Sequence, residues 1–105
     1  MNKPKNITVM GRRWFNRGPG NTYHSVVVAA DGVTVATVPF AYGYGSMYLQ
    51  TAADVAEAAG LMPGREHHVN GGAESLRWYC RRNGITFSDD VCDVYARRDL
   101  HNGGR

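Results

Sequence analysis

Several residue types that mark familiar classes of protein are scarce in this 105-residue chain. There are two cysteines, Cys80 and Cys92, so a disulfide scaffold is not expected, although a single bridge between them stays open. No apolar run approaches the roughly 18 residues of a membrane helix, and none near the start is long enough for a signal peptide. We therefore expect one soluble domain, residues 1–105, in a reducing cytoplasm.

Aliphatic side chains and lysine are also few. Leu, Ile, Val and Phe make up about a fifth of the chain, a share that by itself is typical of disordered proteins. Six Tyr and two Trp compensate, because each aromatic side chain buries about 150–250 Å². The basic residues are ten Arg against two Lys, and guanidinium groups pair with phosphate or carboxylate and stack on rings. This balance permits a nucleic-acid or acidic-protein partner, with an ordinary basic surface as the alternative.

The N-terminal half is predicted to form antiparallel strands. Residues 7–15 alternate loosely between apolar and polar side chains and indicate a first strand, which turn-forming residues 16–21 end. Two Val-rich strands follow at 22–30 and 33–40. Asp31-Gly32 lies between them, and this dipeptide favours the positive φ angles of a type I′ turn. A hairpin is therefore predicted around residues 31–32.

Helical periodicity begins after the glycines at 43 and 45. Ser46 is a candidate N-cap, apolar residues recur on one face as far as Ala59, and Gly60 is a natural stop. That face is rich in alanine, so this helix is expected to approach its sheet closely.

The C-terminal half is predicted to contain a second helix and the closing strands. Residues 61–72 indicate a mobile loop, residues 73–82 a second helix, and residues 85–87 and 91–95 one or two strands, followed by a frayed tail at 101–105. The order β-β-β-α-α-β predicts an α+β domain, an antiparallel sheet with two helices packed on one face.

The second predicted helix combines arginines with a tryptophan. The side expected to face the core holds Leu76, Tyr79, Cys80 and Asn83. The opposite side carries Arg77, Trp78, Arg81 and Arg82. A Trp beside several guanidinium groups can anchor a protein or nucleic-acid partner. Alternatively, Trp78 packs under a loop or the last strand with Arg82 stacked over it.

A second Arg-aromatic cluster lies at residues 12–17. On a strand, Arg12 and Trp14 face one way and Arg13 and Phe15 the other, so one aromatic is expected in the core and one beside an Arg. Tyr23, Tyr42 and Tyr44 extend a platform on which unpaired bases can stack, contributing about 1–3 kcal/mol per base. The predicted binding residues in the whole chain are Arg12, Arg13, Trp14, Arg17, Tyr42, Tyr44, Arg77, Trp78, Arg81 and Arg82.

Motifs for enzyme chemistry are missing. The glycines at 43, 45 and 60 form neither GxGxxG nor a Walker loop. His67 and His68 are adjacent, without CxxC or HExxH, so no metal site is predicted. Cys80 or Cys92 as a nucleophile with His24 as base has no support beyond residue type. We expect no enzyme and no cofactor; a metal-dependent hydrolase remains a minor alternative, built on Asp89, Asp90, Asp93 and Asp99.

Six segments together carry a resemblance that covers most of the chain. They read GRRWF at 11–15, GNTYHSV at 20–26, YGYG at 42–45 with YLQTA at 48–52, and VCDV at 91–94 with RRDL at 97–100. In these the chain resembles small uncharacterised accessory proteins of tailed phages and prophages. The resemblance implies a product that acts in the bacterial host cytoplasm by binding, and it transfers no catalytic residue.

The expected function is therefore non-enzymatic binding of a host protein or ribonucleoprotein complex. Inhibition of a bacterial defence system such as CRISPR–Cas is the form of it that the resemblance favours. The alternative is a small basic protein that binds single-stranded or structured nucleic acid directly. Steep salt dependence of binding to bare oligonucleotides would distinguish the second hypothesis from the first.

Overall fold

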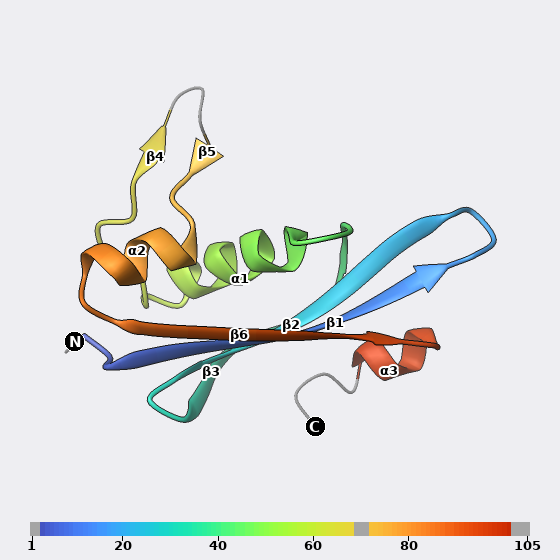
Figure 1. The fold of residues 1–105 in the computed structure, drawn as a ribbon, viewed down its shortest axis with the longest axis horizontal. Coiled ribbons are helices and arrows are strands. Elements are labelled where there is room, and N and C mark those ends of the chain that lie inside the picture. Colours follow the sequence, from blue (N-terminus) through green and yellow to red (C-terminus); the bar gives the residue numbers. More distant parts are fainter. Residues whose placement is uncertain (1–2, 69–71, 102–105) are drawn as a thin grey trace.

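A four-stranded sheet is the framework of the domain in the computed structural model, which describes residues 3–68 and 72–101 (Figure 1). The strands lie in the order β3-β2-β1-β6. Their bounds are β1 Asn6–Asn16, β2 Asn21–Ala30, β3 Val33–Tyr42 and β6 Thr86–Val94. The central pair, β1 and β2, supplies the fully buried positions of the sheet.

The helices of the described residues lie on the two faces of this sheet (Figure 1). Helices α1 (Met47–Ala58) and α2 (Leu76–Arg82) pack on one face, with α1 over β1, β2 and β3 and α2 against β6. Helix α3 (Arg97–His101) packs on the opposite face near the end of β6. A separate ribbon of two short strands, β4 (His67–His68) and β5 (Gly72–Ala73), projects beyond α1 and α2. The predicted α+β class and its two helices on one face are confirmed.

The predicted hairpin is confirmed, and its turn also fixes the start of β1. Asp31 and Gly32 have φ angles of 51° and 82°, as the tight turn requires. The Asp31 carboxylate accepts hydrogen bonds from the backbone N–H groups of Lys5 and Asn6, at 2.9 and 3.0 Å. β1 lies antiparallel to β2, and β2 antiparallel to β3, so one side chain in the turn joins the first three strands.

The last strand differs from the expectation of an antiparallel sheet. Residues 86–94 form one continuous strand, β6, which pairs in parallel with β1 from Asn6↔Thr86 to Trp14↔Val94. A parallel pair needs a long crossover connection. Helices α1 and α2 carry the chain back over the sheet and provide it (Figure 1). The sheet is therefore mixed.

Helix α1 packs as closely as its alanines predicted. Ala52, Ala53 and Ala56 are buried against Val9, Val26 and other sheet residues. Gly11 of β1 is the nearest approach, because a Cβ atom there would lie 2.7 Å from Cδ2 of Tyr48. The helix ends before Gly60, whose φ of 85° suits the predicted stop.

Helix α2 begins three residues later than predicted, and α3 was not predicted at all. The Ser75 hydroxyl accepts a hydrogen bond from the backbone N–H of Trp78, which fixes the first turn of α2. α3 is anchored by Leu100, which is fully buried against the sheet. Most of the predicted frayed tail, residues 102–105, lies outside the described residues.

Substituting Gly11 tests the contact between β1 and α1. Gly11→Ala should lower the free energy of unfolding by about 1–3 kcal/mol, because the added methyl group overpacks the Tyr48 ring. Gly18→Ala is the matched control, since its Cβ would meet only the Asn16 side chain, at 3.6 Å. Urea unfolding of both variants measures the difference; equal stabilities would contradict the close approach.

Candidate functional site

The predicted binding residues separate into two surfaces at opposite ends of the sheet (Figure 1). The α2 surface consists of Arg77, Trp78, Arg81 and Arg82 and lies near the start of β1. The strand-end surface lies around the β1–β2 turn, and its predicted members are Arg12, Arg13, Trp14, Arg17, Tyr42 and Tyr44. The structure does not bring the two sets together into one site.

Helix α2 presents Trp78 to solvent from a firmly packed base. Leu76, Tyr79 and Cys80 are buried on the inner side as predicted, while the Trp78 side of the helix points outward and that residue is 62% exposed. The Arg81 guanidinium lies 5.5 Å from the centroid of the Trp78 ring. The alternative in which Trp78 is covered, with Arg82 over it, is wrong.

Two of the three arginines on the α2 surface are already ion-paired. Arg82 donates from Nε to Glu74 at 2.7 Å, and this hydrogen bond lowers the pKa of the Glu74 carboxyl and raises that of Arg82. Arg77 donates to Asp89 at 3.3 Å. Arg81 forms no ion pair with any described residue. The surface is therefore less positive than its sequence indicated.

An aromatic ladder crosses the strand-end surface on the face that carries α3. Trp14 and Tyr23 stack at 5.8 Å between centroids, and Tyr23 and Phe40 at 4.7 Å. The edge of Tyr42 meets Tyr23 at 5.7 Å. Arg97 of α3 covers the Phe40 ring at 4.6 Å. Trp14 is thus half-buried in a cross-strand stack.

Arg13 and Phe15 lie on the opposite face of the strand-end surface, as the strand alternation indicated. Arg13 donates to Asp93 at 2.9 Å and to the Gly45 carbonyl oxygen at 3.1 Å. Phe15 is displayed beside it and is 54% exposed. Arg12, by contrast, reaches across the α3 face and donates to the backbone oxygen of Asp99 at 2.9 Å. Alternation separated these side chains correctly, but nothing in the sequence indicated what each would contact.

The segment after α1 is held by a buried arginine that the sequence did not single out. The side chain of Arg65 is 2% exposed and donates to Asp54 at 3.0 Å and Glu57 at 2.8 Å, and to the Glu74 carbonyl oxygen at 2.7 Å. Hydrogen bonds from His67 and Arg65 lower the pKa of Glu57. Part of the predicted loop is therefore tied to α1, and His67 is hydrogen-bonded to Glu57 there.

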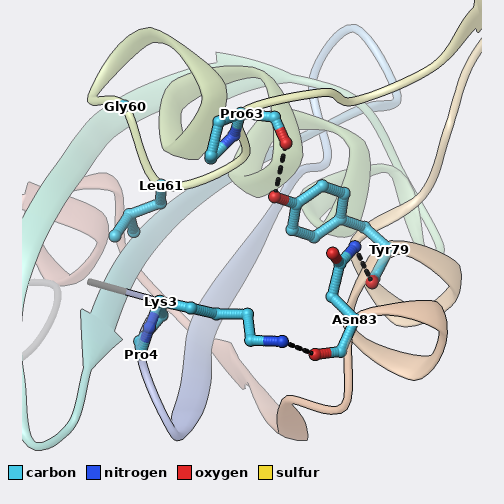
Figure 2. A pocket seen from close by; sticks show the side chains of 7 residues that line it. All are labelled: Lys3, Pro4, Gly60, Leu61, Pro63, Tyr79 and Asn83. Atoms are coloured by element: carbon cyan, nitrogen blue, oxygen red, sulfur yellow. Dashed lines mark hydrogen bonds between the residues drawn. The ribbon is translucent and has the colours of Figure 1, made fainter. Parts of the chain in front are cut away.

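A small pocket beneath this segment is bordered by residues that hydrogen-bond to one another (Figure 2). Its volume is about 140 Å³, and it is lined by Lys3, Pro4, Gly60, Leu61, Pro63, Tyr79 and Asn83. The Tyr79 hydroxyl donates to the Pro63 carbonyl oxygen at 2.7 Å, and the Lys3 ammonium group donates to the backbone oxygen of Asn83 (Figure 2). Ligand pockets usually measure about 300–1,000 Å³. This pocket is smaller than that, and we interpret it as a packing gap between α2 and residues 3–4.

Of the four aspartates considered for a hydrolase, Asp89 and Asp93 are engaged in contacts with other side chains. Asp89 accepts a hydrogen bond from the Tyr48 hydroxyl at 2.7 Å. Burial, together with this hydrogen bond, raises the pKa of Tyr48 to about 12. Asp93 pairs with Arg13, and Asp90 lies on the other face of β6 by strand alternation. Among residues 3–68 and 72–101, no three His, Cys, Asp or Glu side chains gather as a metal site would require.

The residues considered for nucleophilic chemistry are also separated. Cys80 and Cys92 are both free, so the bridge left open by the sequence is absent. Burial raises the pKa of Cys80 to about 11. The buried ring of His24 is bonded through Nδ1 to the Gly43 carbonyl oxygen at 3.1 Å and through Nε2 to the Thr51 hydroxyl at 2.6 Å. His24 therefore ties β2 to the turn before α1.

Acid should weaken the domain through its paired glutamates. The pKa values of Glu57 and Glu74 are lowered in the folded chain, so the stability that they contribute is present above their unfolded pKa, near 4.5, and is lost as pH falls through the folded values. Arg65→Gln should lower the free energy of unfolding at neutral pH by about 1–3 kcal/mol and flatten this acid dependence.

Urea unfolding between pH 3 and pH 7 measures both effects. Arg81→Gln is the control, because Arg81 has no carboxylate partner in the described part of the chain. Its acid dependence should match that of the wild type. An Arg65→Gln variant that unfolds with the wild-type dependence on pH would show that Arg65 does not contribute to the lowered pKa of Glu57.

Comparison with protein-family models, with curated proteins and with solved structures finds no match to this chain. Across residues 3–68 and 72–101, no helix is both long and apolar enough to cross a membrane. Since a fold alone does not imply a function, the function has to be inferred from the chemistry of the two surfaces.

Proposed function

We propose that this chain is a non-enzymatic binding protein whose α2 surface docks on a host protein, either alone or as part of a ribonucleoprotein complex. The observation that carries the proposal is Trp78, which is 62% exposed on a helix whose inner side is buried. Trp and Arg dominate the few interface residues that supply most binding energy. Because α2 is already packed on the domain, binding through this helix would lose little conformational entropy.

The charges around Trp78 favour a protein partner over nucleic acid at this surface. Phosphate binding needs cations that are free to replace the counterions of the nucleic acid. Arg82 and Arg77 are instead held by Glu74 and Asp89, and these carboxylates would repel a phosphate backbone. The remaining arginine, Arg81, lies against the Trp78 ring. The result is an apolar anchor with a mixed-charge rim, which is the usual anatomy of a protein interface.

The resemblance to phage accessory proteins supports the choice of a bacterial host molecule as the partner. On that basis we place the protein in the host cytoplasm, acting as an inhibitor of a defence system such as CRISPR–Cas. Direct binding of nucleic acid is the alternative function, and it is motivated by the strand-end surface rather than by α2.

A pull-down from a nuclease-treated bacterial lysate tests the protein-binding proposal. The wild type should retain one host protein in stoichiometric amount, and Trp78→Ala should lose it. Against the purified partner, Trp78→Ala should weaken binding by at least about 2 kcal/mol, roughly 30-fold in Kd. Thermal unfolding should be nearly unchanged, because the side chain is mostly exposed.

Met10→Ala provides the control, since Met10 is an apolar residue that is 51% exposed and belongs to neither of the two surfaces. This variant should retain the partner as the wild type does. Absence of any stoichiometric protein, or equal retention by Trp78→Ala, would overturn the proposal. A Trp78→Ala variant that unfolds would instead assign Trp78 to the support of the fold.

A further inference from the structure

The strand-end surface contains a groove where β1 and β6 end side by side. Its volume is about 440 Å³, within the usual range for ligand sites. It is lined by Trp14, Phe15, Arg17, Asp93, Val94 and Tyr95. Parallel pairing of β1 with β6 creates this site, because it places the ends of two strands that are distant in the sequence next to each other.

Aromatic side chains with free surface form much of the groove. Phe15 is 54% exposed and Tyr95 is 97% exposed, so each has ring surface that no described residue covers. Trp14 is held in place by stacking on Tyr23. Planar rings displayed on the ends of strands are what unpaired bases stack on, whatever the base identity.

The charged side chains that line the groove favour a ligand with a phosphate group. Arg17 makes no ion pair, hydrogen bond or ring contact with the described residues, in contrast to Arg13 and the ion-paired arginines of α2. It is exposed beside the groove and free to meet a phosphate. The single carboxylate in the lining, Asp93, is already paired with Arg13, so its repulsion of a phosphate is reduced.

We propose that this groove binds an unpaired nucleotide of a single-stranded nucleic acid, with the base stacked on Phe15 and Tyr95 and a phosphate at Arg17. An acidic peptide would use the cation but not the rings. A base-paired duplex would keep its base faces covered. The site is independent of the α2 surface, so either can function if the other does not.

Fluorescence anisotropy with a labelled 15-nucleotide oligo(dT) tests the groove. Tyr95→Ala and Phe15→Ala should each weaken binding roughly 5- to 150-fold, as loss of one stacking contact predicts. Arg17→Gln should weaken binding and reduce the slope of log K against log salt by about 0.7, the share of one phosphate contact. Met10→Ala is the control, because Met10 is an apolar residue that is 51% exposed but does not line the groove.

A second measurement uses the tryptophan in the groove. The chain has two Trp residues, so Trp78→Phe leaves Trp14 as the single tryptophan. With excitation selective for tryptophan, oligo(dT) should quench its fluorescence. Circular dichroism should show every variant folded.

Three results would overturn the proposal. The first is no binding of oligo(dT) at low salt. The second is binding that Tyr95→Ala and Phe15→Ala leave unchanged. The third is equal competition by poly-glutamate, which would show attraction by charge alone.

Discussion

β1 is paired along nearly its whole length on both sides, antiparallel to β2 and parallel to β6. A strand in this position has no free edge, so its register determines where every other element can lie. The Asp31 carboxylate fixes the start of that register by binding the backbone at Lys5 and Asn6. Gly11 then admits α1 at the middle of the strand. Helix, hairpin and groove are all placed relative to β1.

The two surfaces differ in how their charges are used. On the α2 surface, carboxylates from neighbouring segments neutralise Arg77 and Arg82, which leaves an exposed indole as the main feature. At the strand ends, Arg17 forms no ion pair with the part of the chain that the structure describes, and it lies beside exposed rings. From the sequence alone the two clusters could not be distinguished, because both combine arginines with aromatic residues. Their difference arises from which acidic residues the fold brings near them, and it is the reason why we propose a different kind of ligand for each surface.

Patterns in the sequence predicted those elements that are determined by residues close to one another in the chain. The Asp31-Gly32 turn, the alanine face of α1 and the inner side of α2 all follow from residues close in sequence. The parallel direction of β6 does not, because a strand's own residues do not determine the direction of its neighbour. The burial of Arg65 depends on acceptors from three separate positions. Helix α3 has only five residues and one buried apolar anchor, Leu100, so it shows no periodicity to detect.

The two cysteines lie in very different surroundings, and this has a practical consequence. Cys80 is buried in the core, and burial raises its pKa to about 11, so almost none of its thiol is ionised at neutral pH. Cys92 is exposed on β6, one residue from the groove residue Asp93. Thiolate is the reactive form of cysteine. A maleimide reagent should therefore attach to the native chain at one position, next to the strand ends, and a fluorophore placed there would report on what approaches that end of the sheet.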